Sequence, residues 1–201
     1  MIAIFRHGET VLNNDRCMQG WFDSPMTDKG IDQVEGTCRH FIANHLDPEK
    51  QVDFYCSDLG RSVHSKELFE KQWTLDRSTK SMSLRESSWG LYEGKDVGTE
   101  EMVGMLFGRK DNEFGYRPTD GESMGDCFHR VSRFLDINQL RQDNEDVTTI
   151  FHVHTNVIRC LLGIYLKLDI PDFMPSSRRF EIDHGNYYVI TGNHCQEEKL
   201  S

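Results

Sequence analysis

Short apolar segments alternate with segments of helical periodicity along this chain, and this alternation restricts the fold more than any other feature. Met1–Phe5, Val52–Cys56 and Val147–Val153 are apolar runs, typical of strands buried on both faces of a sheet. A helical pattern follows each run and can return the chain to the start of a parallel neighbour. The sequence therefore predicts an α/β fold, a three-layer α/β/α sandwich with a mostly parallel sheet.

Apolar residues at intervals of three and four mark the expected helices. Thr27 is the expected N-cap of the first, whose apolar positions extend from Ile31 to Leu46. Three more helices are expected over Gly60–Trp73, Glu122–Gln142 and Asn156–Leu168. The remaining expectations are weaker strands at Ser81–Leu84, Phe180–Ile182 and Tyr187–Thr191, a turn over 143–146 and frayed residues from Asn193.

The length of 201 residues suits one domain, or one domain with a small insertion, and we expect a single domain over residues 1–201. The segment from Glu86 to Gly121 is rich in glycine, charge and aromatic residues and lacks a clean period. We expect it to be an insertion that forms a lid over about 87–121, with one short helix near Glu100–Phe107.

Charge, apolar runs and cysteine spacing exclude several classes of protein. A formal net charge of −10 argues against nucleic acid as a partner. Arg159 and Lys167 interrupt the longest apolar stretch, so we expect no membrane span. The N-terminus has no basic region before an apolar core, so we expect no signal peptide and a cytoplasmic location. Six scattered cysteines show no zinc spacing, and we expect reduced thiols, no metal and no cofactor.

Charged and imidazole side chains follow the expected strands at the point where each strand ends. Arg6-His7 follows the first, Arg61 the second, Glu86 the third and His154 the strand at Val147–Val153. Ligands bind at the carboxyl edge of an open α/β sheet, so these groups are expected to meet there. Arginine offers a planar fork of donors that fits phosphate oxygens, and imidazole is a nucleophile near neutral pH. The set predicts phosphoryl transfer through a histidine.

The string Arg6-His7-Gly8-Glu9-Thr10 resembles the signature of the histidine phosphatase superfamily, which has the phosphoglycerate mutase-like fold. Five specified residues should occur by chance less than about once in 10,000 chains of this length. The resemblance extends to about residue 186, through Asn13, Gln19-Gly20, Asp23 to Gly30, Ser57-Asp58-Leu59-Gly60-Arg61, Leu84-Arg85-Glu86, Glu93-Gly94-Lys95, Gly121-Glu122-Ser123 and His154 to Arg159.

This resemblance implies a role for each strand-end residue. His7 would attack phosphorus and become phosphohistidine, while Arg6, Arg61 and protonated His154 hold the equatorial oxygens. Glu86, at the position of the family's acid, would protonate the leaving oxygen and then deprotonate water. Gly8 would let the backbone approach the ligand closely. The family pattern further implies substrate-binding roles for Asn13, Gln19, Gly20 and Thr155.

Other polar residues near these motifs are interpreted as structural. Thr155 replaces the glycine that usually follows the second histidine, and its hydroxyl either donates to the phosphate or crowds it. His152 alternates to the other face of its strand, and His184 is expected in a packing or polar-network role. Glu93 and Glu9 are the carboxylates that compete with Glu86, and Glu93 is interpreted as a hydrogen-bonded structural group. Ser57 and Asp58 are interpreted as cap and turn residues.

Three functions fit these residues. The first is a metal-independent phosphomonoesterase, similar to histidine acid phosphatases, acting on a small phosphorylated metabolite. The second is a phosphoglycerate mutase, which needs a lid that excludes water. The segment Gly90-Leu91-Tyr92-Glu93-Gly94-Lys95 resembles the phosphatase branch, which favours the first. The third is a non-catalytic binding protein, which retention of His7 and Glu86 disfavours.

The substrate is not defined by the sequence. Lys95, Arg109, Lys110 and Arg117 are candidates to meet a second anionic group, although a solvated surface explains them equally well. A small phosphorylated substrate is the one partner expected, and whether the chain forms a homodimer stays open.

Overall fold

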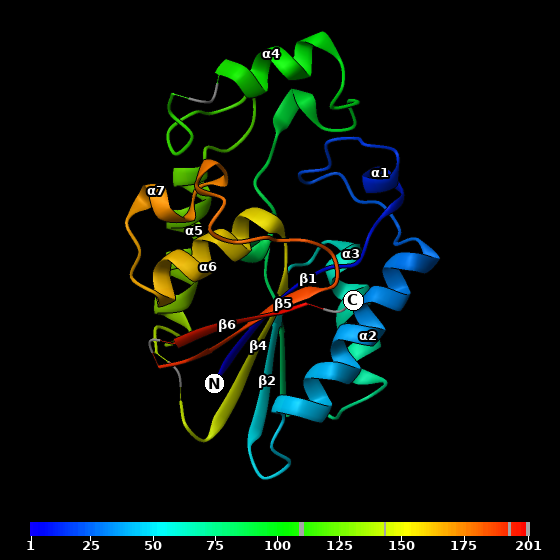
Figure 1. Cartoon of the computed structure of the whole chain (residues 1–201), viewed down its shortest axis with the longest axis vertical. Helices are drawn as coiled ribbons and strands as arrows, with labels where there is room; N and C mark the ends of the chain where they lie inside the picture. The colour runs from blue at the N-terminus through cyan, green and yellow to red at the C-terminus, as the bar shows by residue number, and fades with distance from the viewer. Residues whose placement is uncertain (109–110, 143, 193, 200–201) are drawn as a thin grey trace.

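The computed structural model describes residues 1–108, 111–142, 144–192 and 194–199 (Figure 1). The strands are β1 (Ile2–Arg6), β2 (Gln51–Cys56), β3 (Arg77–Lys80), β4 (Val147–Val153), β5 (Asn186–Thr191) and β6 (His194–Lys199). The α-helices are α1 (Val11–Asn14), α2 (Asp28–His45), α3 (Gly60–Glu70), α4 (Glu100–Gly108), α5 (Met124–Ile137), α6 (Thr155–Tyr165) and α7 (Ile170–Phe173). Three 3₁₀ turns in the described residues are Met82–Leu84, Gly90–Tyr92 and Pro175–Ser177.

Within these residues six strands form one sheet in the order β3-β2-β4-β1-β5-β6. β3, β2, β4 and β1 are parallel, and β5 is antiparallel to both of its neighbours. The parallel strands therefore end at the same edge, toward the top of Figure 1. This is the edge where the sequence places its catalytic candidates.

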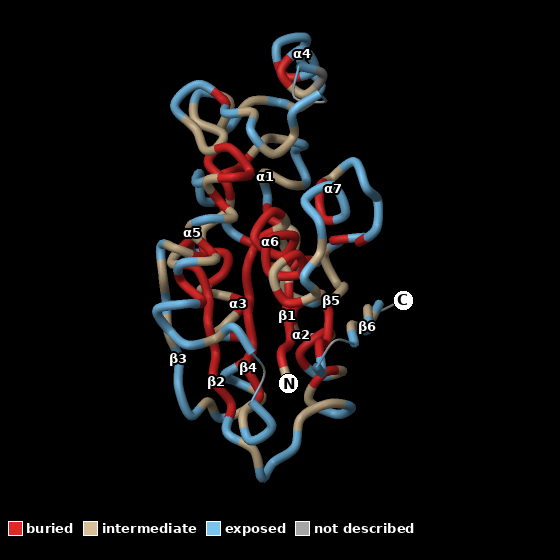
Figure 2. The backbone as a smooth tube through the Cα atoms, turned by 90° about the vertical axis from the view of Figure 1, so that its left-hand side faces the viewer, coloured by how far each residue is buried: buried red, intermediate tan, exposed pale blue. Residues whose placement is uncertain are grey.

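Helices cover both faces of the sheet. Side chains of β1 alternate between the faces: Ile2 and Ile4 pack in the apolar cluster that contains α5 and α6, and Ala3 and Phe5 in the cluster that contains α2 and α3. Figure 2 shows the buried backbone concentrated in the central strands, with exposed backbone in α4 and at both outer strands. The expected three-layer α/β/α sandwich is confirmed.

Two strand predictions are wrong. Ser81–Leu84 is not a strand, because Met82–Leu84 is a 3₁₀ turn whose first N–H groups are capped by the Ser81 hydroxyl, which accepts from Ser83 N. The strand lies just before it, at Arg77–Lys80, and its polar sequence reflects its position at the edge of the sheet. Phe180–Ile182 is irregular backbone whose Phe180 and Ile182 side chains are buried in the core.

The C-terminal segment is not frayed in the described residues, because His194–Lys199 forms β6 and pairs with β5 over its full length. Residues 143 and 193, which belong to the expected turn and the expected fraying point, lie outside the described residues.

The helices start close to the predicted residues and end earlier. Thr27 caps α2 by accepting from Gly30 N at 3.0 Å, and Ser123 caps α5 in a reciprocal capping box. α5 ends at Ile137 rather than Gln142, because Gln139 adopts a left-handed conformation (φ 56°). Lys167 (φ 52°) ends α6 in the same way. Neither position is glycine, the residue that most often marks the end of a helix, so these two helix ends could not be predicted.

The insertion after Glu86 lies beyond the carboxyl edge of the sheet, with α4 at the top of Figure 1. The helix at Glu100–Gly108 agrees with the one expected near Glu100–Phe107. The insertion is tied to the loop after α1 by backbone hydrogen bonds: Met18 N donates to Lys95 O at 2.9 Å, and Val97 N donates to Arg16 O at 3.0 Å. None of the helices in the described part of the chain has the length and apolar character needed to cross a bilayer.

Candidate active site

His7 follows the last residue of β1 and is held by backbone contacts on both sides. Its N–H donates to Val153 O at 3.1 Å, and its ring Nδ1 lies 2.8 Å from Gly8 O. A carbonyl oxygen only accepts, so Nδ1 carries the proton and the lone pair is on Nε2. Burial lowers the pKa of His7 well below its ordinary value, and the nearby Arg61 adds to this. The ring is therefore neutral and has a free lone pair.

Gly8 is required by the packing of this loop, a reason that the sequence did not indicate. A Cβ on Gly8 would lie 2.0 Å from Gly30 O, inside van der Waals contact. Gly30 belongs to the first turn of α2, so the glycine allows the loop after β1 to pass directly against that helix. The contact fixes the position of His7 next to it.

Arg61 occupies the first turn of α3 and is buried, at 2% exposure. Its Nη2 donates to Gly20 O at 2.7 Å, and its Nη1 donates to Phe22 O at 2.9 Å. Asp23 lies 3.4 Å from Nη1 and accepts from the backbone N–H groups at the start of α3, so it caps the helix that carries Arg61. Burial lowers the pKa of Arg61, and Glu86 opposes the shift.

Arg6 is the last residue of β1, and its Nη1 donates to Ile182 O at 2.8 Å. Burial lowers its pKa to about 10, so the guanidinium keeps its charge at neutral pH. The irregular segment around Ile182, which the sequence presented as a strand, thus positions one of the two site arginines.

His154 follows the last residue of β4 and is the N-cap of α6, with no exposed surface. Its Nε2 lies 2.7 Å from the hydroxyl of Ser57, whereas its Nδ1 has no hydrogen-bond partner within the described residues. Its ring is tilted against that of His7 at a centroid distance of 5.1 Å. Burial, reinforced by Arg61 and Arg6, lowers the pKa of His154 well below its ordinary value, so it is neutral in the unliganded site. The sequence indicated only a cap or turn role for Ser57, and this contact was not predicted.

Glu86 follows the 3₁₀ turn after β3, and its side chain is held against the start of α6. Its Oε1 accepts from Ser87 N at 2.9 Å and from Asn156 N at 3.2 Å. Burial raises its pKa, while these backbone donors, Arg61 and Arg6 limit the rise. Glu86 is thus a carboxyl group that holds its proton to higher pH than a solvated glutamate does.

Arg130 of α5 holds the backbone of this acid-bearing segment in place, and the sequence analysis missed it. Its Nη1 donates to Ser83 O and Arg85 O, both at 2.9 Å, and it pairs with the Glu122 carboxylate at 2.8 Å. The two carbonyls lie 47 and 45 residues away in the sequence, so no local pattern indicates these contacts.

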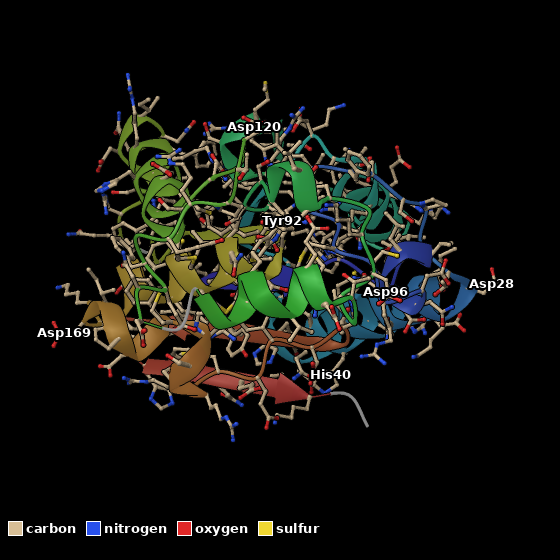
Figure 3. The ribbon with its side chains drawn as sticks, turned by 90° about the horizontal axis from the view of Figure 1, so that it is seen from above. Asp28, His40, Tyr92, Asp96, Asp120 and Asp169 are labelled. Carbon is tan, nitrogen blue, oxygen red and sulfur yellow. The ribbon has the colours of Figure 1, made fainter. Side chains whose placement is uncertain are left out.

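One cavity of about 360 Å³ joins most of the predicted site residues. It is lined by Arg6, His7, Asn13, Gln19, Gly20, Arg61, Glu86 and Thr155, with Arg16, Cys17, Met18, Trp89, Val97 and Asn156. His154 is not part of this lining and lies behind it, in contact with the His7 ring. Figure 3, seen from above, shows α4 across this end of the molecule, with Tyr92 near the centre and Asp96 between α4 and α1.

The expected substrate-binding residues occupy the loop after β1 and the start of α6. Asn13 closes the turn by capping Thr10 reciprocally, and Gln19 Nε2 donates to Thr10 Oγ1 at 2.7 Å. The carbonyl oxygen of the Gln19 side chain is buried and has no partner within the described residues. Thr155 is the first residue of α6 and lines the cavity.

The two competing carboxylates are engaged elsewhere. Glu93 accepts from the backbone N–H groups of Trp21 (3.0 Å), Phe22 (3.1 Å) and Trp89 (2.9 Å), which confirms it as a hydrogen-bonded structural group. Glu9 pairs with Lys29 at 2.8 Å, away from the cavity lining. Glu86 is the carboxyl group that lines the cavity in the described residues.

Two further histidines lie near the site but do not line the cavity. His152 is fully buried and stacks between Phe5 and Phe54, at centroid distances of 5.0 and 5.8 Å, which agrees with a structural role. His184 Nδ1 lies 2.8 Å from His7 O, so it supports the loop after β1 through a backbone contact. In the described part of the chain, no group of three or more His, Cys, Asp or Glu is placed to hold a metal ion.

Comparison with known proteins agrees with this geometry. The family model of the histidine phosphatase superfamily, branch 1, matches residues 2–200. The chain therefore belongs to the histidine phosphatase superfamily. The named relatives include phosphatases and a probable phosphoglycerate mutase.

Individual relatives differ in their named activities. A probable phosphoglycerate mutase, GpmB of Yersinia pestis (strain Pestoides F), is 30% identical over 137 residues, which is 67% of this chain and 61% of that protein. The chain thus matches about three fifths of the length of this relative.

Solved structures show the same fold. A putative α-ribazole-5′-P phosphatase from Escherichia coli K-12 is similar with a TM-score of 0.75 and 22% identity, covering 99% of this chain and 94% of that one. A mycobacterial glucosyl-3-phosphoglycerate phosphatase is similar with a TM-score of 0.75 and 21% identity, covering 93% and 90%.

Proposed function

We propose that this protein is a metal-independent phosphomonoesterase, similar to histidine acid phosphatases, that hydrolyses a small phosphorylated metabolite through a phosphohistidine at His7. The observation that carries the proposal is the Nδ1 contact of His7 with Gly8 O, which puts the lone pair on Nε2 beside a cavity lined by Arg6, Arg61 and Glu86. A neutral nucleophile, two guanidinium groups and one carboxyl group with a raised pKa make up the groups that the reaction needs.

In the first step, Nε2 of His7 attacks phosphorus, and the bond between phosphorus and the ester oxygen breaks. Glu86 gives its proton to the leaving oxygen, so the product leaves as an alcohol. Arg6 and Arg61 hold the equatorial oxygens, where negative charge is spread in the transition state. His154 contributes a donor through Nδ1, and the dianionic substrate favours a proton on its ring.

In the second step, water attacks the phosphohistidine, and the bond between phosphorus and Nε2 breaks. The Glu86 carboxylate takes a proton from the attacking water, which restores the acid for the next turnover. Inorganic phosphate then leaves, and His7 returns to its neutral form. Atoms and protons balance over the two steps: one ester and one water give one alcohol and one phosphate.

Hydrolysis is favoured over mutase activity by the form of the insertion. Trp89 and Val97 line the cavity, but no described residue of α4 does. An insertion that leaves the cavity open admits water to the phosphohistidine, whereas a mutase must exclude it. The similarity to a probable phosphoglycerate mutase makes mutase activity the second candidate.

The test is a panel of phosphate esters assayed with and without EDTA. We expect phosphate release from at least one ester, no loss of activity in EDTA, and an acid-labile phosphate trapped on His7 after rapid quenching. His7→Ala should abolish both release and trapping. Full activity in His7→Ala would refute the mechanism, and an absolute requirement for a divalent ion would refute metal independence.

A second assay separates the two candidate functions. With 3-phosphoglycerate and a trace of 2,3-bisphosphoglycerate, we expect little 2-phosphoglycerate. Rapid interconversion of the monophosphoglycerates, with negligible phosphate release from every ester, would assign the protein as a mutase.

A further inference from the structure

The cavity contains a cationic side chain that the proposed chemistry does not use. Arg6 and Arg61 supply the positive charge for the phosphoryl group, and Arg16 is the other arginine that lines the cavity within the described residues. No ion pair or hydrogen bond engages its side chain in the described part of the chain. In a chain of net charge −10, an unpaired guanidinium beside a phosphate site is a local attraction for anions.

Four cationic residues were candidates from the sequence to bind a second anion. Two of them form ion pairs, and the other two lie outside the described residues. Lys95 pairs with Glu101 at 2.6 Å, and Arg117 pairs with Asp126 at 2.7 Å. Residues 109 and 110 lie outside the described residues. Arg16 was not among these candidates. Its charge is unpaired in the described residues, and it lines the cavity.

The backbone holds Arg16 in place on two sides. Its N–H donates to Asn13 O at 3.1 Å, and its carbonyl accepts from Val97 N of the insertion at 3.0 Å. Arg16 adopts a left-handed conformation, with φ of 57°. This region disfavours residues with a side chain, and outliers of this kind gather at functional sites. An arginine at a position that glycine or asparagine would occupy at lower cost points to a function of its side chain.

The arrangement of the cavity gives the order of groups in the substrate. His7 and Arg61 are buried, with exposures of 4% and 2%, whereas Arg16 is exposed. The phosphoryl group at His7 is therefore at the inner end, and Arg16 is on the solvent side. Met18 and Val97 line the same cavity with apolar surface. A leaving group bound in this cavity would contact these apolar side chains with its carbon skeleton and Arg16 with an anionic substituent.

We propose that Arg16 binds a second anionic group, a carboxylate or a phosphate, on the leaving-group side of the substrate. The substrates are then small organic phosphomonoesters that carry two anionic groups. This inference rests on the proposed function, which places the ester phosphate at His7. Both anions share the ability to accept hydrogen bonds from the guanidinium fork of arginine.

Two pairs of esters test the inference and distinguish the two anions. In the first pair, 3-phosphoglycerate carries a carboxylate that glycerol 3-phosphate lacks. In the second, fructose 1,6-bisphosphate carries a phosphate that fructose 6-phosphate lacks. For at least one pair, we expect the doubly anionic ester to have a kcat/KM about tenfold higher, the effect of one charge-assisted contact. Arg16→Gln should remove this preference mainly through KM, and Arg16→Lys should retain part of it.

The matched control is Arg178→Gln. Arg178 is also an exposed arginine with a left-handed backbone (φ 52°), and it does not line the cavity. The Arg178→Gln variant should keep the same preference for doubly anionic esters as the unsubstituted protein. Equal kcat/KM within both pairs would overturn the inference, and so would equal losses in Arg16→Gln on both members of the pair that shows the preference.

Equilibrium binding separates a failure of this inference from a failure of the proposed function. Isothermal titration of the same four esters measures affinity without turnover. If no ester is hydrolysed, the hydrolase assignment is wrong, and tighter binding of the doubly anionic esters that is lost in Arg16→Gln would still support the subsite. Equal affinities for both members of each pair would refute it.

Discussion

The hydroxyl of Ser57 lies 2.7 Å from Nε2 of His154, and both residues have no exposed surface. Because a hydroxyl both donates and accepts, this contact persists whether the His154 ring is neutral or protonated. When Ser57 donates to Nε2 of the neutral ring, the proton is on Nδ1, from which it can be donated to a phosphate oxygen. We therefore propose that Ser57 is a positioning residue that orients His154 and favours this tautomer.

We expect Ser57→Ala to lower kcat by about 10- to 100-fold with a smaller effect on KM, the range for losing a hydrogen bond to a charged group. The physical reason is that His154 loses the partner that fixes its tautomer while the arginines still bind phosphate. Steady-state kinetics on one ester measures the split. Ser65→Ala is the matched control, since Ser65 is another buried serine, whose hydroxyl donates to Arg61 O at 2.9 Å. A loss in KM alone would contradict the positioning role.

The main groups of the site could be located from the sequence because ligands bind at the carboxyl ends of parallel strands. His7, Arg61 and Glu86 each follow such a strand, and the sheet brings those ends together. The contacts of Ser57 and Arg130 could not be predicted in this way. Ser57 has the local appearance of a turn residue, and its contact with His154 depends on the pairing of β2 with β4. Arg130 donates to backbone carbonyls, which every residue has, so the residue types do not indicate these contacts.

The fold, like the site, could be predicted only in part. The buried strands and the amphipathic helices followed from apolar periodicity, because they bury one or both faces in the core. The edge strands did not: Arg77–Lys80 and His194–Lys199 are largely polar, since they are stabilised by pairing with one neighbour rather than by burial. The packing of Gly8 against Gly30 could not be predicted either, because it is a tertiary contact between residues that are distant in the sequence.

His152 makes the protein sensitive to acid. Burial lowers its pKa to about 3, so the unfolded chain takes up a proton well before the folded one as the pH falls. The stability that a neutral His152 allows is complete above the unfolded pKa of about 6.5 and is lost progressively below it, by about 2 kcal/mol at pH 5. We expect His152→Phe to reduce the fall in Tm between neutral and mildly acid pH by several degrees.

Thermal melts at the two pH values measure this difference, which is independent of the overall stability of each variant. His194→Gln, at an exposed position of β6, is the control and should keep the slope of the unsubstituted protein. An unchanged slope in His152→Phe would show that other groups dominate the acid response.

The activity is expected to peak at acid pH. A neutral His7 is required, and burial beside Arg61 lowers its pKa, so loss of the nucleophile on acidification starts below the ordinary histidine range. A protonated Glu86 is also required, and burial raises its pKa, so the acid form persists above the ordinary glutamate range and is lost as the pH rises further. A profile of kcat/KM against pH should be bell-shaped.

Glu86→Gln identifies the alkaline limb of this profile. The substrate phosphate itself ionises near about pH 6, and comparing the two proteins on one substrate cancels that contribution. The variant should lose the fall in activity that Glu86 causes at higher pH. An identical alkaline limb in both proteins would assign that ionisation to another group.

The leaving group decides whether Glu86 acts as an acid or only positions the substrate. An alkyl phosphate releases an alkoxide that needs a proton, whereas p-nitrophenyl phosphate releases a stable phenolate. We expect Glu86→Gln to lower kcat by about 10²- to 10⁴-fold on glycerol 3-phosphate, the usual contribution of general acid catalysis, and much less on p-nitrophenyl phosphate. Glu9→Gln removes a carboxylate that pairs with Lys29 outside the cavity lining, so it should affect the two esters equally and weakly. Equal losses on both esters in Glu86→Gln would mean that the carboxyl group held against Ser87 N and Asn156 N orients the substrate without transferring a proton.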